Sequence, residues 1–280
     1  MAGKAAAAED GTSDPGRFVT GLGRGIAGAL FLGLPMLMTM EMWYLGFYMA
    51  RERLFLLLML NIPLLILLAH RIGFEKTHGW REAVRDATIA YGIGIITSLV
   101  VLAALGLLRG DMPAGELVGK VALQSVPASI GAMLGRSQLG QDEDTTEGRE
   151  TTYAGELLLM GAGALFLSLN IAPTDETMVL AYKMTNWHAF VVAIISIALM
   201  HGFVYAVSFV GGHELSPQTP WWHAFVRFTL PGYIVALVIS AFALWVFERL
   251  DDSSLSQSLL SVIVLGFPAS LGAAAARLIL

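Results

Sequence analysis

The sequence predicts an all-α polytopic membrane protein with eight transmembrane helices, arranged as two parallel four-helix repeats. Composition is the first observation: 56% of the 280 residues are hydrophobic and only 14% are charged. A soluble domain of this length needs far more polar surface, so an integral membrane protein is predicted. Long apolar runs and an internal repeat are the other two observations. The chain has no cysteine, which excludes disulfides and cysteine-ligated metals.

The individual segments follow from hydropathy along the chain. Residues 1–23 are small and polar, lack the apolar region of a signal peptide, and predict a disordered cytosolic tail. An eighth candidate span, 113–135, carries Glu116, Lys120 and Gln124, so taken alone it fits either a span or an amphipathic surface helix. Seven clearer stretches approach or exceed the roughly 20 mostly apolar residues that a spanning helix needs: 25–49, 54–72, 84–108, 155–181, 188–211, 225–247 and 256–279.

An internal repeat organises these segments. Residues 28–34 match residues 163–169 at six of seven positions. The motif Pro-Ala-Ser-x-Gly-Ala at 127–132 recurs at 268–273, in the same order along the chain. Chance similarity between apolar helices rarely keeps such matches collinear, so the chain is predicted to contain a duplicated unit.

The repeat also decides the number and direction of the spans. It divides the chain into units 24–136 and 155–280, joined by an acidic cytosolic linker over 137–154. It pairs 113–135 with the apolar stretch 254–276, so the weaker candidate is predicted to span. With four helices each, both units enter the membrane from the same side and are related by an axis along the membrane normal.

Charge predicts that both termini are cytosolic. In that orientation 11 Lys and Arg side chains fall on the inner side and five on the outer side, as the positive-inside rule requires. The tryptophans agree, because they fall near the two predicted boundaries, as aromatic belts do: Trp43, Trp187 and Trp245 on the outer side and Trp80, Trp221 and Trp222 on the inner side.

Carboxylates in the first segment of each unit are the leading functional candidates. Glu41 and Glu176 fall at equivalent positions, and a charge in the apolar zone usually faces a cavity or a partner. Brought together by a pseudo-two-fold axis, they would form a cation site whose mutual repulsion raises one pKa and makes the site proton-sensitive. Pro173 predicts a helix break that frees carbonyl oxygens as further ligands. The candidate ion-binding or pore residues are Glu41, Glu176, Asp175, Thr39, Thr174 and Asn170.

A structural interpretation of the same residues stays open. Trp43 follows Glu41 by two residues, so this carboxylate can simply reach interfacial water. Thr174 or Asp175 can instead cap the next helical turn.

Four other polar residues are secondary candidates. Glu116, Lys120 and Gln124 lie at i, i+4 and i+8 and form one polar stripe, which is either a pore lining or an internally paired helix contact. His201 lies alone in the sixth span, a position more typical of a hydrogen bond between helices than of an ion ligand.

The predicted function is a membrane ion channel or transporter, with small cations as the favoured substrate. The alternative is a non-transporting structural or regulatory membrane protein. Sequence motifs of zinc hydrolases, serine hydrolases and phosphate-binding loops are absent, so no enzyme, cofactor or metal centre is predicted. The expected partners are the lipid bilayer and small cations, without nucleic acid, and homo-oligomerisation is left open.

The first-helix segments carry a resemblance to a known family. Residues 28–35 with 39–43, and residues 170–176, resemble segments of a family of uncharacterised bacterial integral membrane proteins, a domain of unknown function built from two tandem repeats. The resemblance runs over most of residues 20–280. It implies a multi-pass protein of the bacterial inner (plasma) membrane and no particular activity.

Overall fold

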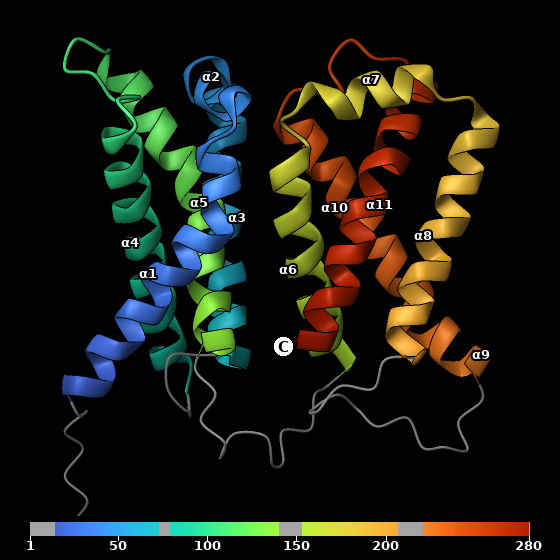
Figure 1. Ribbon diagram of the computed structural model, residues 1–280, viewed down its shortest axis with the longest axis horizontal. Coiled ribbons are helices and arrows are strands. Elements are labelled where there is room, and N and C mark those ends of the chain that lie inside the picture. The colour runs from blue at the N-terminus through green and yellow to red at the C-terminus, as the bar shows by residue number, and fades with distance from the viewer. Residues whose placement is uncertain (1–14, 73–78, 140–152, 207–220, 280) are drawn as a thin grey trace, which may run out of the picture.

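A computed structural model describes residues 15–72, 79–139, 153–206 and 221–279 (Figure 1). Within these ranges the chain is helical and contains no strand. Eight stretches there are long and apolar enough to cross a membrane, which confirms the predicted all-α fold with eight spans. The helices are α1 (Pro15–Leu37), α2 (Met40–Tyr48), α3 (Arg51–Ile72), α4 (Trp80–Ala104), α5 (Ala114–Leu139), α6 (Tyr153–Ile171), α7 (Asp175–Lys183), α8 (Asn186–Ala206), α9 (Trp221–Ala224), the π-helix η2 (Phe225–Thr229), α10 (Leu230–Val246) and α11 (Leu255–Ile279). The predicted tail 1–23 and linker 137–154 fall largely outside the described residues.

Two predicted segments each consist of a long helix and a short one. The stretch 25–49 is α1 followed by α2, and 155–181 is α6 followed by α7. At each break a threonine has an extended backbone, with φ −85° and ψ 119° at Thr39 and φ −77° and ψ 149° at Thr174. Pro173 lacks the N–H that would continue α6, in agreement with the predicted break. The candidate carboxylates therefore stand at helix starts and not in the middle of a span.

The two units use the same packing scheme. In the first unit α5 packs against α1, α2, α3 and α4, and in the second unit α11 packs against α6, α7, α8 and α10. The most apolar window of α5 is 83% buried, so 114–135 is a span and not a surface helix. The duplication itself stays a prediction, and this equivalence of packing partners supports it.

Glycines of the repeated motifs make this packing possible. A Cβ atom added to Gly28 would collide with the carbonyl oxygen of Gly131, and one added to Gly163 would collide with that of Gly272. The backbones of the first and last helices of each unit therefore touch directly, as small residues permit between membrane helices. The two repeated motifs lie at opposite ends of each unit in the sequence, and this contact brings them together in the structure.

The two units meet through non-equivalent faces. Across the boundary α3 contacts α6 and α10, whereas its counterpart α8 lies at the far edge of the second unit (Figure 1). A two-fold axis at the boundary would place α3 and α8 alike, and the described helices do not show that arrangement. The approach of Glu41 and Glu176 stays a prediction. Figure 1 places α2 and α7 at one end of the molecule, here named the α2–α7 end.

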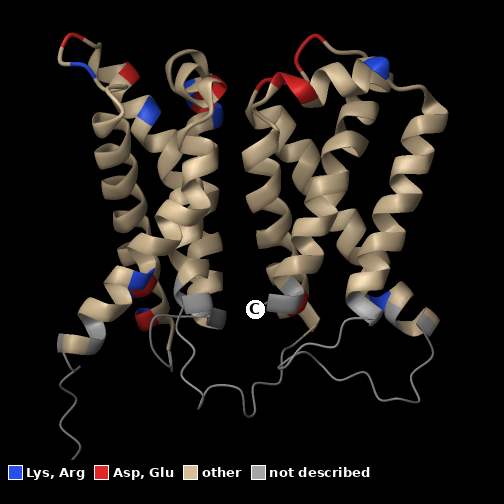
Figure 2. Cartoon of the chain, viewed as in Figure 1, with Lys and Arg blue, Asp and Glu red and all other residues tan. Residues whose placement is uncertain are grey.

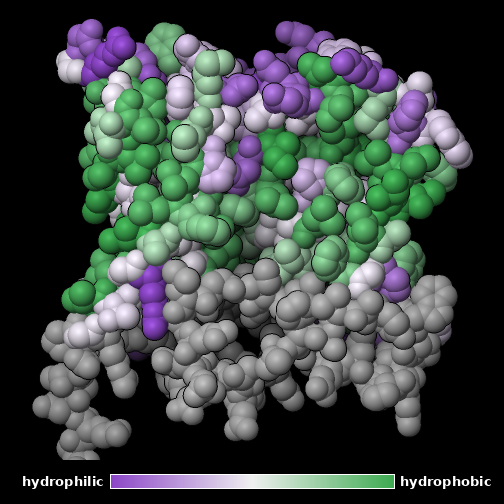
Figure 3. All heavy atoms as spheres, viewed as in Figure 1, coloured by the Kyte–Doolittle hydropathy of each residue, from purple (hydrophilic) through white to green (hydrophobic). Residues whose placement is uncertain are grey.

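Charge and hydropathy divide the surface into layers. Charged residues gather towards the two ends, and the middle of the helices is almost free of them (Figure 2). On the face shown in Figure 3, hydrophobic side chains form a broad band below the polar α2–α7 end. This is the pattern that a bilayer with a hydrocarbon core of about 30 Å demands.

Candidate functional site: the boundary at the α2–α7 end

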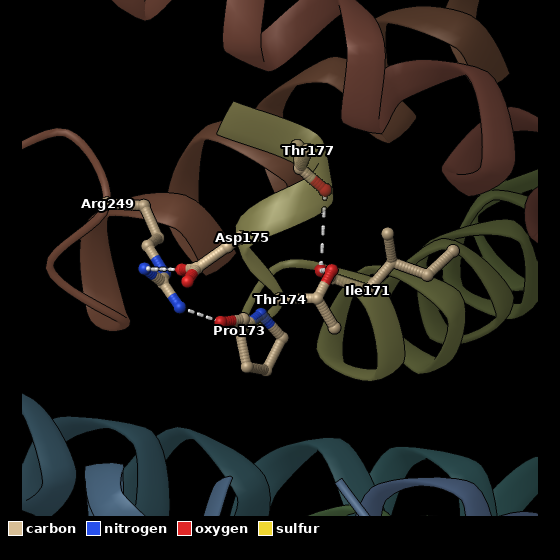
Figure 4. Close-up of polar contacts among 6 residues, drawn as sticks. All are labelled: Ile171, Pro173, Thr174, Asp175, Thr177 and Arg249. Atoms are coloured by element: carbon tan, nitrogen blue, oxygen red, sulfur yellow. Dashed lines mark hydrogen bonds and ion pairs between the residues drawn. The ribbon is translucent and has the colours of Figure 1, made fainter. Parts of the chain in front are cut away.

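The two helix breaks satisfy their own carbonyl groups. The Thr39 hydroxyl donates to the Pro35 carbonyl oxygen at 2.6 Å, and the Thr174 hydroxyl donates to the Ile171 carbonyl oxygen at 2.9 Å. Neither threonine caps the following helix through its side chain, although each stands at the N-cap position. The Thr177 hydroxyl, at 3.4 Å, is directed at the same Ile171 oxygen (Figure 4). The hydroxyl protons of these threonines are therefore used in hydrogen bonds to carbonyl oxygens near the ends of α1 and α6.

An arginine occupies the predicted cation position beside the second break. Arg249 donates from Nη1 to Asp175 Oδ1 at 2.8 Å and from Nη2 to the Pro173 carbonyl oxygen (Figure 4). A carboxylate and a carbonyl freed by proline are the ligands that the sequence predicted for an ion. In the structure a guanidinium group, which is a tethered cation, binds both.

Arg249 belongs to a loop that closes α10 in an unusual way. The preceding residue, Glu248, has φ +62°, in the left-handed region that disfavours side chains. Arg249 N–H donates to the Leu244 carbonyl at 2.8 Å, which completes a Schellman-type helix end. At the equivalent end of α4, Leu107 N–H bonds the Leu102 carbonyl at 2.9 Å, and the left-handed residue is Gly106.

The Glu248 side chain explains why glutamate stands where the first unit has glycine. Its Oε1 accepts a hydrogen bond of 2.7 Å from the Ala50 N–H, at the start of α3 in the other unit. A left-handed conformation costs an L-residue about 1–2 kcal/mol. Such strain persists only where other contacts hold the residue, and here the contact crosses the boundary.

A second cross-boundary contact lies one turn along α3. Arg53 donates to the Trp245 carbonyl oxygen at 2.7 Å and forms an ion pair of 2.9 Å with Asp251. Its guanidinium also lies over the Trp245 ring, 5.0 Å from the centroid. The end of α10 and the loop after it therefore contact the start of α3 through two side chains, Glu248 from the loop and Arg53 from α3.

Tyr48, the last residue of α2, marks the point where charges of both units converge. Partial burial is the main cause that raises the pKa of Tyr48 above its ordinary value of 10. The Arg249 guanidinium opposes this shift in pKa, and the carboxylates of Glu248, Asp175 and Glu41 reinforce it. Glu41 and Asp175, one from each unit, thus both act electrostatically on the same tyrosine. Glu176 is exposed on α7 and is not among these groups.

We name this set the boundary cluster. It consists of Glu41, Tyr48, Arg53, Asp175, Glu248, Arg249 and Asp251. Glu41 and Asp175 are predicted from the sequence, whereas Arg53 and Arg249 enter that prediction only as positive charges of the outer side. The usable signal was the exchange of Gly106 for Glu248 between otherwise equivalent helix ends.

The secondary candidates are paired inside the helical packing. Lys120 Nζ lies 2.7 Å from Glu116 Oε1, with side chains only 9% and 18% exposed, and Gln124 Nε2 donates to the Met36 carbonyl at 3.3 Å. Of the two interpretations of the stripe, this geometry favours an internally paired helix contact. Asn170, one of the leading candidates, is also bonded within its own helix, because its amide donates to the Phe166 carbonyl one turn earlier at 2.7 Å.

His201 makes the contact between helices that its position predicts. Its Nδ1 lies 3.0 Å from the Thr229 hydroxyl of η2, and its ring meets the Phe225 ring edge to face at 5.3 Å. No group of three or more His, Cys, Asp or Glu side chains in the described part of the chain is arranged to hold a metal ion.

Eight apolar helical spans among the described residues, with charged ends and an apolar middle, define a polytopic α-helical integral membrane protein. A comparison with protein families then identifies the family within that class. Residues 21–280 match the family model described as "Putative integral membrane protein (DUF2391)", and the chain belongs to this family. Neither a curated protein nor a solved structure matches the chain.

Proposed function

We propose that the protein moves small cations across the membrane along the boundary between its two units, with the boundary cluster as the entrance. The observation that supports this proposal is that Glu41, Asp175 and Glu248 all act electrostatically on Tyr48 and raise its pKa. With Asp251 the cluster holds four carboxylates against two guanidinium groups, Arg53 and Arg249. An acidic entrance raises the local concentration of cations, as rings of carboxylates do in cation channels.

Arg249 supplies a physical basis for opening and closing. Its guanidinium binds the Asp175 carboxylate and the Pro173 carbonyl, which are hard oxygen ligands suited to a small cation. A permeating cation competes with Arg249 for the same oxygens. Entry of the cation therefore requires the guanidinium to leave, and its return displaces the cation.

The orientation that belongs to this proposal follows from charge. By the positive-inside rule the α2–α7 end faces the outside, and the membrane is the bacterial inner membrane. Cations then enter from the outer side. Accessibility of a cysteine introduced at the exposed position Glu176 to a membrane-impermeant maleimide on intact cells tests this orientation, and labelling only after lysis contradicts it.

The alternative is a non-transporting structural or regulatory protein, and one observation favours it. Glu248 and Arg53 tie the two units together through a backbone N–H, a backbone carbonyl and an ion pair. A boundary fixed in this way suits a scaffold whose task is to present its ends to partners. Under this alternative the cluster stabilises the fold and carries no ion.

Flux into proteoliposomes separates the two. Purified protein reconstituted in vesicles should admit Na⁺, K⁺, Ca²⁺ or H⁺, and the double variant Glu41→Gln, Asp175→Asn should lose that flux with an intact fold. Glu52→Gln is the matched control, because Glu52 is an exposed carboxylate at the same end outside the cluster. Absence of flux of all four cations in wild-type vesicles rules out the proposal, and so does unchanged flux in the double variant.

A further inference from the structure

A small cavity, partly open to the surface of the protein, lies at the boundary between the two units, away from the boundary cluster. Its volume is about 30 Å³. Leucines of α3 and Val126 of α5 form its wall on the first unit, and Leu165 of α6 and Phe242 of α10 form the wall on the second unit. Asn61 of α3 is the one polar side chain among the lining residues.

Asn61 has one amide group that the surrounding protein does not satisfy. The side chain is only 2% exposed, and its Nδ2 donates to the Ser129 hydroxyl at 2.9 Å. The Ser129 hydroxyl in turn donates to the Val126 carbonyl at 2.8 Å, so it can only accept from Asn61. Among the described residues, none provides a donor within hydrogen-bond distance of Asn61 Oδ1.

The position of Asn61 makes this oxygen conspicuous. Asn61 is the eleventh of the 22 residues of α3, so it lies about 15 Å from either end of the helix at 1.5 Å per residue. That depth is the middle of the hydrocarbon core, where no bulk water is at hand to hydrogen-bond a polar group. A buried carbonyl without a donor is unfavourable there, and a donor from a bound molecule removes the penalty.

We propose that this cavity is a binding site for water, held by Asn61 Oδ1 at mid-membrane depth between the two units. The volume exceeds the roughly 10–15 Å³ that one water molecule needs. A bare metal cation does not suit the site, because such ions take several oxygen ligands and the wall offers one. A lipid chain does not suit it either, since the cavity is too small for more than a methylene or two.

The water site holds whether or not the protein transports cations. If cations follow the boundary, the bound water is a polar position between otherwise apolar walls. If they do not, the water satisfies Asn61 and joins α3 to the second unit. The proposal therefore stands apart from the proposed function.

Radiolytic hydroxyl-radical labelling of the full-length protein in lipid nanodiscs tests the site. Radicals formed from a bound water modify the side chains beside it, and the aromatic ring of Phe242 is the most reactive group in the wall. We expect Phe242 to be oxidised in the wild-type protein. Asn61→Leu removes the oxygen, Val126→Leu fills the cavity while leaving the Asn61–Ser129 bond intact, and both variants should lose the label.

Asn170→Leu is the matched control, since it removes a half-buried asparagine outside the cavity and should leave the label on Phe242 unchanged. Monodisperse elution in gel filtration shows that each variant is folded. Should Asn61→Leu fail to fold, Val126→Leu still decides the question. Wild-type Phe242 that stays unmodified, or Phe242 that is modified equally in Val126→Leu, overturns the proposal.

Discussion

Glu248 permits a quantitative test of the contact between the two units. Replacing Glu248 with glycine reproduces the residue that the first unit has at the same helix end, Gly106. The change relieves a left-handed conformation that costs about 1–2 kcal/mol. It also removes a hydrogen bond from the Ala50 N–H to a carboxylate, and bonds to charged groups contribute about 1.5–3 kcal/mol.

The two effects oppose each other, and the larger one sets the sign. We expect Glu248→Gly to lower the free energy of unfolding by roughly 0.75 kcal/mol, because the midpoint of the range for the charged hydrogen bond exceeds the midpoint of the range for the strain. For a chain of this size the unfolding midpoint should fall by roughly 1.5–3 °C. Thermal unfolding in detergent, followed by tryptophan fluorescence, measures the shift, and Trp245 lies directly beside the contact.

Two companion variants separate strain from contact. Glu248→Gln keeps the conformation and an acceptor oxygen, so it should lose about 1 kcal/mol through the charge alone. Gly106→Ala places a Cβ at φ +72° with no compensating contact and should cost about 1–2 kcal/mol. A Glu248→Gly protein that is more stable than the wild type would refute the view that this residue was placed for its contact with α3.

Further predictions concern other contacts. Lys120→Met leaves the half-buried Glu116 without its ion-pair partner and should cost less in denaturant unfolding than the roughly 3–5 kcal/mol of a fully buried pair. Adding Glu116→Gln should recover most of this loss, and equal losses contradict the pairing. Tyr48 has a raised pKa, so its stabilising effect is complete below pH 10 and disappears as the pH rises through the folded-state pKa; Tyr48→Phe should therefore lose less stability above pH 10 than the wild type. Gly28→Leu should prevent α1 from reaching α5 and give aggregates in gel filtration. Arg249→Ala should raise cation flux in vesicles if the guanidinium closes the entrance, and lowered flux contradicts that role.

The fold could be predicted from sequence wherever one property of the chain decides it. Hydropathy located the spans, because a bilayer forces about 20 apolar residues into each crossing helix. The repeat predicted that 113–135 crosses the membrane. In the structure the backbone of Gly131 in this segment touches that of Gly28 in α1, so the segment packs directly against another span. The position of Pro173 indicated the break after α6. The break after α1 was not predicted. Pro173 directly precedes Thr174 at the second break, but no proline directly precedes Thr39 at the first.

The candidate site could be predicted only in part, because it depends on how loops meet. Asp175 and Glu41 stand out as carboxylates next to apolar helices. Nothing local shows that the Arg249 guanidinium reaches Asp175, since 74 residues separate them in the chain. Nor does composition show that Glu248 adopts a left-handed conformation, which follows from the contact with Ala50 and not from its own preference.

The non-equivalent packing of the units has a consequence for the number of sites. Units facing each other through a two-fold axis would have two identical clusters or one symmetric cluster at the axis, and Glu41 would have Glu176 as its counterpart. Here α3 contacts the second unit, whereas α8, whose most apolar window is only 17% buried, does not contact the first among the packings that the structure describes. The described helices therefore form one such cluster, in which residues of the two units differ in role: Glu41 adds negative charge, while Asp175 binds Arg249. If the predicted duplication holds, two similar sequence units form an asymmetric site, and the Gly106 and Glu248 helix ends are where that asymmetry can be measured.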